Sequence, residues 1–202
     1  YVERLCEAEA GWTESLIYLW GGSGVGRSHL LQAACLRMEQ LGLLAVYLPL
    51  MELVEHGPSI LDNLEQCELV CLDDVQALAG RADWEEAVFH LFNRLRDSGR
   101  RLLLSANCSP RELPVGLPDL QSRLTLALVF QLQSLSDEDK LRALQLRASR
   151  RGLQLSDEVG RFILTRGTRS MSALFDLLER LDQASLQAQR KLTIPFLKAT
   201  LG

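Results

Sequence analysis

Short apolar runs alternate with longer amphipathic segments along the first two thirds of the chain. The runs are rich in Leu, Val and aromatic residues, and we predict that five of them form β-strands, at residues 16–20, 44–48, 69–73, 101–105 and 126–131. The segments between them predict helices around residues 28–41, 84–97 and 117–123. Strands that alternate with helices are typical of a parallel sheet covered by helices, so this part is predicted to be an α/β domain.

The pattern changes at Leu135, and no strand is predicted beyond it. Ser136 is followed three residues later by Asp139, the arrangement of an N-cap with an acidic partner, and the helix that it opens stops at Gly152. Further helices are predicted from behind Ser156 to about Gly167, from Ser170, and, as a short one, after Thr193. The chain is therefore predicted to divide into an α/β base, residues 1–134, and a small all-helical lid, residues 135–202.

The composition is that of a globular protein without a surplus of positive charge. Lys and Arg number 22 against 26 Asp and Glu, and this net charge of −4 argues against a protein that coats nucleic acid or membrane. Any contact with nucleic acid must be local. No apolar run approaches the ~18 residues of a membrane span. The five cysteines are odd in number and scattered, as expected in a reducing compartment, so a cytoplasmic protein is predicted.

The strongest chemical signal lies at residues 21–28, Gly-Gly-Ser-Gly-Val-Gly-Arg-Ser, which follow a predicted strand and open a predicted helix. This is the spacing of the phosphate-binding loop G-x-x-x-x-G-K-S, with Arg27 in place of lysine. Glycines let backbone N–H groups turn toward a phosphate, the helix N-terminus adds partial positive charge, and the Ser28 hydroxyl can ligate Mg²⁺. The predicted nucleotide-binding residues are Gly21, Gly22, Ser23, Gly24, Val25, Gly26, Arg27, Ser28 and His29.

The arginine at position 27 changes what is expected of this loop, namely how far it favours binding a nucleotide over hydrolysing it. Arginine keeps the positive charge, but its planar fork suits holding a phosphate better than following a phosphoryl group in transfer. The substitution therefore favours nucleotide binding over turnover. For His29 on the following helix, a purely structural role is the alternative.

Two carboxylates end the apolar run at residues 69–72. Asp73 is placed to hold Mg²⁺ through water, and Asp74 to polarise an attacking water, as in P-loop ATPases. An apolar strand that ends in Asp-Asp is weak evidence alone, but it is strong after a phosphate-binding loop. The pair predicts that Asp73 joins Ser28 as a nucleotide and metal ligand, and it leaves Asp74 as a candidate catalyst.

Two further polar residues follow later elements. Asn107 comes after the fourth predicted strand, where its side chain could sense the γ-phosphate; an ordinary turn before Ser109-Pro110 is an equal alternative. Arg123 ends the short helix before the last strand, where it could reach a neighbouring subunit's nucleotide and stabilise transition-state charge. Most arginines on short helices are solvated, so position alone does not favour this role.

Several segments resemble those of a known family, both in their residues and in their order along the chain. The segments 28–31, 72–76, 105–107, 110–113 and 119–124 occur in the order found in the AAA+ module of the bacterial replication initiator DnaA. Closer likenesses, at residues 18–20, 26–31, 135–141 and 188–196, are to the DnaA/Hda group, which includes DnaA-related regulators. The resemblance covers essentially the whole chain.

The resemblance implies a fold, a cofactor and partners. The fold is an AAA+ P-loop NTPase base, with a five-stranded parallel sheet and flanking helices, plus the helical lid. The implied activity is that of an ADP-bound (or ATP-bound) regulator, tethered to the DNA polymerase III sliding clamp on DNA, that promotes hydrolysis of ATP held by DnaA. It would thus prevent re-initiation of replication without being an enzyme itself. Residues 21–28 with Asp73 would hold its own nucleotide, and Arg123 would act on DnaA in trans.

This sequence departs from the family's pattern at three points, and each limits which family properties can be assigned to it. The family's short N-terminal clamp-binding peptide is missing from the given residues, so the chain as given is not expected to bind the clamp. Gln131-Leu132 is expected to be core rather than a substitute for that peptide. Ser172 stands where AAA+ lids carry an arginine, with Arg169 as a candidate stand-in or a surface residue. Asp74 leaves a weak intrinsic ATPase open, so an autonomous AAA+ ATPase of the helicase-loader type is the main alternative. An assembly module and self-association through the nucleotide cleft also stay open.

Overall fold

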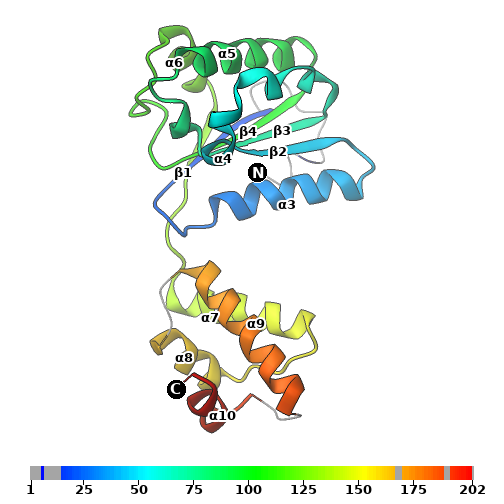
Figure 1. The fold of residues 1–202 in the computed structure, drawn as a ribbon, viewed down its shortest axis with the longest axis vertical. Helices are drawn as coiled ribbons and strands as arrows, with labels where there is room; N and C mark the ends of the chain where they lie inside the picture. Colours follow the sequence, from blue (N-terminus) through cyan, green and yellow to red (C-terminus); the bar gives the residue numbers. More distant parts are fainter. Residues whose placement is uncertain (1–5, 7–14, 167–169, 189–191, 202) are drawn as a thin grey trace. The chain divides into compact units, whose positions relative to one another are not determined.

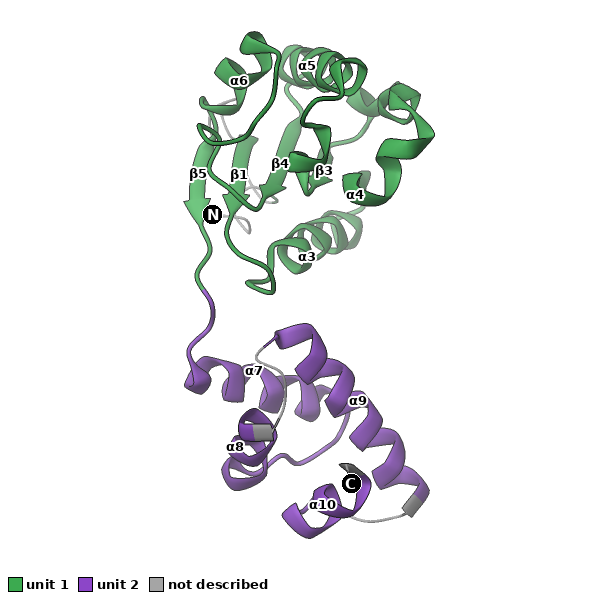
Figure 2. Cartoon of the chain, turned by 60° about the vertical axis from the view of Figure 1, so that its left-hand side comes forward, with its two compact units in different colours: residues 1–133 green, residues 134–202 purple. Residues whose placement is uncertain are grey.

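The computed structural model describes residues 6, 15–166, 170–188 and 192–201. The chain forms two compact units, Tyr1–Gln133 and Ser134–Gly202 (Figure 2). The boundary predicted from the sequence lies one residue later, after residue 134. Each unit has a hydrophobic core of its own.

Unit 1 is built on a five-stranded sheet in which every neighbouring pair is parallel. The strand order is β2-β3-β4-β1-β5. The bounds are β1 Leu16–Trp20, β2 Ala45–Pro49, β3 Leu69–Asp73, β4 Arg101–Ala106 and β5 Leu128–Gln131. The predicted α/β fold class is therefore confirmed. Because β1 lies between β4 and β5, and β3 pairs with β4, the carboxyl ends of β1, β3 and β4 meet at one edge of the sheet.

The last strand begins two residues later than predicted. Leu126 and Ala127 are apolar and extend the sequence pattern of the strand, but their N–H groups bond back to the carbonyls of Arg123 and Leu124. The preceding helix therefore holds them in a turn. At the other end of β5, Gln131 is exposed and Leu132 packs against the sheet, so the expected core placement is right for Leu132 and wrong for Gln131.

Helices cover both faces of this sheet (Figure 1). On one face lies α3, Arg27–Gln40, whose Leu31, Ala34 and Met38 are buried against the strands. On the other lie α5, Ala82–Asp97, and α6, Pro118–Leu124. A short helix α4, Leu50–Leu53, and single turns at Val54–His56, Pro58–Leu61, Leu64–Gln66 and Val75–Leu78 complete the unit. These short elements carry too little periodicity to predict.

Unit 2 consists, over its described residues, of four helices around a Leu-rich core. They are α7 Asp137–Arg150, α8 Asp157–Arg166, α9 Met171–Ala188 and α10 Ile194–Leu201. The predicted N-cap is present, because the Ser136 hydroxyl accepts from the Asp139 N–H at 3.1 Å. The predicted helical lid is thus confirmed as a fold. No helix among the described residues has the length and apolarity to cross a bilayer.

Candidate functional site

The loop between β1 and α3 has the backbone that a phosphate-binding loop requires. A Cβ on Gly21 would lie 2.5 Å from the Leu132 carbonyl oxygen, so the neighbouring chain excludes any side chain there. Gly24 and Gly26 have φ values of 76° and 97°, a region that favours glycine. Gly26 is the N-cap of α3 and provides no side-chain cap, so the first N–H groups of α3 are left for an anion.

Arg27 connects the start of this loop to Asp74, the acidic residue that follows β3. Its Nη1 donates to the Gly21 carbonyl at 3.0 Å, and its Nη2 pairs with Asp74 Oδ1 at 3.0 Å. The two side chains are 13% and 25% exposed, so solvent screens the pair only in part. Arg27 therefore holds together two of the predicted site residues, the loop and Asp74.

A glutamine extends this network to β4. Asp74 Oδ1 also accepts from Gln76 Nε2 at 2.9 Å, and Gln76 Oε1 accepts from the backbone N–H of Asn107 at 3.1 Å. Asp74 itself adopts the left-handed conformation, with φ 57°. The structure thus brings Asn107 to the site through its backbone, while its side chain is exposed. Gln76 is not predictable as a site residue from the sequence, because it lies in a single helical turn that carries no motif.

Asp73 is buried, with 2% exposure, and its carboxylate is satisfied by neighbours. Oδ2 accepts from Tyr47 Oη at 2.6 Å, while Oδ1 accepts from the Ser105 hydroxyl and from the Asp74 N–H. Tyr47 comes from β2 and Ser105 from β4, the two neighbours of β3 in the sheet. Sequence reasoning missed both, since the strand order is needed to place them beside Asp73.

The Tyr47 phenol joins both predicted metal ligands. Burial raises the pKa of Tyr47 above its ordinary value, and donation to Asp73 raises it further. Side-chain hydrogen bonds to Ser28 and Gln32 act in the opposite direction. Ser28 and Asp73 therefore both lie beside the phenol oxygen of Tyr47, and both carry an oxygen atom that can ligate a metal ion.

This donor set fits Mg²⁺, which binds through one or two protein oxygens together with nucleotide phosphates. Among the described residues, no cluster of three or more His, Cys, Asp or Glu side chains could hold a metal by itself. Nucleotide phosphates would accordingly have to complete the coordination of a cation here. The remaining loop candidate, His29, has an exposed side chain, and no described residue forms a hydrogen bond or ion pair with it.

Arg123 lies apart from this network, in the last turn of α6. Its guanidinium carbon stands 5.9 Å from the ring centroid of Phe92 on α5. The side chain is half-buried, and no carboxylate among the described residues pairs with it. The structure therefore does not bring Arg123 together with the chain's own phosphate-binding loop residues by any described contact.

Ser172, which is predicted to stand where AAA+ lids carry an arginine, lies at the start of α9 in unit 2. The Ser172 hydroxyl lies 2.7 Å from that of Ser170 and is exposed at the start of α9. Arg169, the candidate stand-in, lies outside the described residues. The role of either residue toward a nucleotide stays a prediction.

Two family models match the chain, one for each unit. The model of the bacterial DnaA ATPase domain matches residues 3–131, and that of the Hda lid domain matches residues 137–201. The chain belongs to the DnaA/Hda-type AAA+ family. The predicted membership of this family is therefore confirmed, because the two matches together span most of the chain.

Solved structures agree with the fold of this DnaA/Hda-type chain. Domain III of DnaA from Thermotoga maritima is 20% identical, with a TM-score of 0.80 over 99% of this chain and 88% of that one. DnaA bound to AMPPCP and single-stranded DNA is 22% identical, with a TM-score of 0.74 over 93% of this chain and 62% of that one. A RuvB variant from Thermotoga maritima is 14% identical, with a TM-score of 0.71 over 99% and 64%. These likenesses confirm an AAA+ fold, and this chain spans about three fifths of the longer DnaA.

Proposed function

We propose that this chain is an ADP-binding regulator of replication initiation that stimulates hydrolysis of DnaA-bound ATP together with the sliding clamp on DNA. The observation that carries the proposal is the lid, residues 137–201, which matches the Hda lid domain and follows a DnaA-type base. A DnaA-related base could belong to an initiator or to a regulator, and an Hda-type lid favours the regulator. On this proposal the protein limits re-initiation and does not catalyse a reaction alone.

The chain's own nucleotide would bind at the loop before α3. The uncapped N-terminus of α3 and the guanidinium of Arg27 supply positive charge for phosphates. Ser28 and Asp73 would hold Mg²⁺, which when bound would neutralise phosphate charge. A related DnaA binds AMPPCP, which supports a nucleotide in this fold.

The contacts of Asp74 favour retention over turnover of that nucleotide. Its Oδ1 already accepts from Arg27 and Gln76, so that oxygen is not free to orient an attacking water. A general base must lie within hydrogen-bond reach of the proton that it removes. The network therefore supports a protein that holds ADP, while Arg123 supplies the chemistry at another molecule's ATP.

Arg123 has the properties that an arginine acting in trans requires. Phe92 supports its guanidinium from one side, and no described carboxylate neutralises it. A planar guanidinium binds phosphate oxygens in a bidentate way and stabilises the charge that develops in phosphoryl transfer. We propose that Arg123 meets the γ-phosphate of the ATP held by DnaA.

The second candidate is an autonomous AAA+ ATPase of the helicase-loader type. The presence of the carboxylate Asp74 directly after β3 favours it, since an ATP-hydrolysing motor needs such a group. The pairing of that carboxylate with Arg27 counts against it. Retained ADP after purification would favour the regulator, and rapid exchange with ATP turnover would favour the motor.

The deciding experiment measures hydrolysis of ATP preloaded on DnaA, with DNA-loaded clamp and with this chain carrying a clamp-binding peptide before Tyr1. Wild type is compared with Arg123→Ala and with Arg96→Ala, a matched arginine paired with Asp97 at the surface. The proposal expects wild type and Arg96→Ala to accelerate hydrolysis and Arg123→Ala to fail while retaining ADP. Absent acceleration, combined with ATP turnover by the chain alone, would establish the motor instead.

A further inference from the structure

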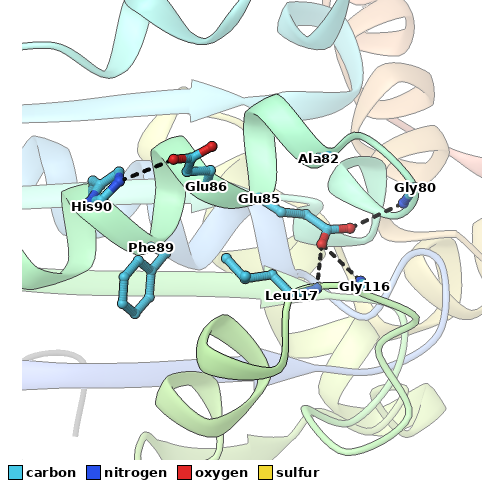
Figure 3. Close-up of a pocket in the computed structure, with 8 residues that line it drawn as sticks. All are labelled: Gly80, Ala82, Glu85, Glu86, Phe89, His90, Gly116 and Leu117. Carbon is cyan, nitrogen blue, oxygen red and sulfur yellow. Dashed lines mark hydrogen bonds and ion pairs between the residues drawn. The ribbon is translucent and has the colours of Figure 1, made fainter.

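Glu85 is a buried carboxylate that the proposed function does not use. It lies in the first turn of α5 and is 2% exposed. Acidic side chains are almost never fully buried unless their charge is compensated. The compensation here comes from the backbone, because three N–H groups donate to this one carboxylate (Figure 3).

The three donors belong to two different turns. Gly80, in the turn before α5, donates to Oε1 at 3.2 Å. Gly116 and Leu117, in the turn before α6, both donate to Oε2 at 2.8 Å. Charge-assisted hydrogen bonds of this kind are roughly twice as strong as neutral ones. Glu85 therefore fixes the turn that starts α6 onto the start of α5.

The site of attachment is the N-terminus of α6. Leu117 is its N-cap and makes no side-chain cap, and Pro118 follows as the first helical residue. The Oε2 of Glu85 accepts from the N–H of the N-cap residue and of the residue before it, as the acidic residue of a capping box accepts from the N-cap N–H, at the end of the helix where partial positive charge accumulates. A negative charge supplied from α5 stabilises α6 and sets where it begins.

The opposite end of α6 is also placed on α5. Leu120 and Leu124 are buried in the core that α5 shares, and Arg123 lies over the ring of Phe92. Phe92 is seven residues after Glu85, which is two helical turns, so both contacts come from one side of α5. Helix α6 is consequently held at its first turn by Glu85 and at its last turn by Phe92.

We propose that Glu85 is a positioning residue for Arg123: it sets the placement of α6 from which the guanidinium reaches the ATP of a partner. The inference rests on the proposed function, because it assigns a task to the same arginine. An arginine that stabilises a transition state must be placed closely, and a displacement of about 1 Å can cost about a hundredfold in rate. Loosening the start of α6 therefore lowers stimulation of DnaA without touching the chain's own nucleotide loop.

The first test is Glu85→Gln, with Glu86→Gln as its matched control. The amide of glutamine keeps one oxygen but turns an NH₂ group toward backbone N–H donors, so part of the attachment is lost. Stimulation of hydrolysis of DnaA-bound ATP is expected to fall about ten- to a hundredfold, while ADP retention is unchanged. Glu86 is 71% exposed and contacts His90 at 3.6 Å, so its variant is expected to behave as wild type.

A second variant removes a donor and leaves the buried carboxylate intact. Leu117→Pro deletes the N–H that reaches Oε2, at a residue whose φ of −85° a proline can approach. A loss in the same direction, with faster hydrogen exchange at Gly116, is expected. Normal stimulation by either variant, once exchange shows that the 116–117 turn has loosened, would overturn the proposal.

The double variant Glu85→Gln/Arg123→Ala separates positioning from general stability. If Glu85 acts through Arg123, the double variant is no worse than Arg123→Ala, whereas an additive loss would show a separate structural role and overturn the inference. If Arg123→Ala alone is as active as wild type, the proposed function fails and this inference fails with it. If Arg123→Ala is inactive and Glu85→Gln is fully active, the proposed function stands and the positioning role falls.

Discussion

The chain presents two arginines in two contrasting regions of unit 1. At the edge of the sheet, Arg27 is enclosed by its own molecule, with Gly21 on one side and Asp74 on the other. At the end of α6, Arg123 is supported by the ring of Phe92 and has no carboxylate partner among the described residues. One guanidinium is paired with a carboxylate of its own chain, and on the proposed function the other is available to the ATP of a partner.

On the proposed function, this difference separates nucleotide binding from catalysis within a single fold. A charged pair that is satisfied within the chain stabilises a closed arrangement and makes the nearby acid a poor activator of water. An arginine held in place by an aromatic ring and a fixed helix is preorganised without being neutralised, and preorganisation is what stabilises a transition state. The contrast predicts that changes in the two regions affect different measurements.

The largest expected effect comes from Arg123→Lys. Lysine keeps the positive charge but lacks the planar fork that binds phosphate oxygens in a bidentate way. Stimulation of hydrolysis of DnaA-bound ATP should fall about a hundredfold or more, while ADP affinity stays at the wild-type value. A lysine variant that stimulates normally would show that charge alone matters and would weaken the contrast between the two arginines.

Arg27→Ala is expected to give the reverse pattern. The change frees Asp74, leaves its charge near the bound phosphates, and removes the link to Gly21. ADP binding should weaken by about 1.5–3 kcal/mol, which is roughly ten- to a hundredfold, in calorimetric titrations. The control is Arg81→Ala, since Arg81 forms an exposed pair with Glu55 and should leave ADP binding unchanged. Equal losses in both variants would contradict the assignment.

The sequence predicts the loop and the acids of the site because their signals are local. Residues 21–28 show the spacing directly, and Asp73 ends a run of apolar residues. The fold class follows in the same way, since alternation of strands and helices is a property of consecutive residues. Features that depend on consecutive residues, such as the loop and the fold class, can therefore be predicted from the sequence.

The partners of those residues could not be predicted, because they come from distant segments. Tyr47 and Ser105 reach Asp73 as a result of the strand order β2-β3-β4, which no local pattern encodes. Glu85 stands beside Glu86 in the first turn of an amphipathic helix, where acidic residues are usually solvated. Its burial follows from the packing of α6 against α5, a tertiary contact.

Gly21→Ala tests the backbone of the enclosed region. The new methyl group would lie 2.5 Å from the Leu132 carbonyl, so the loop or the chain after β5 must move. We expect the free energy of unfolding to fall by about 1–3 kcal/mol in denaturant titrations, as for other overpacked positions. Gly22→Ala is the matched control, since nothing lies within 4 Å of a Cβ there. Comparable stability of the two variants would mean that the close approach to Leu132 is not needed.

The smallest expected effect is that of Tyr47→Phe, which leaves the oxygen atoms of Ser28 and Asp73 more available to a metal ion. The phenol donates to Asp73 and also interacts with Ser28, so it competes with Mg²⁺ for both oxygen ligands. Its removal loses a hydrogen bond worth about 0.5–1.5 kcal/mol, and the Mg²⁺ concentration for half-maximal ADP binding should fall severalfold. Tyr18→Phe loses a comparable bond, to the Cys108 carbonyl, and should leave that concentration unchanged. If both variants need as much Mg²⁺ as wild type, the phenol does not compete with the cation, and the closure of this region rests on Arg27 alone.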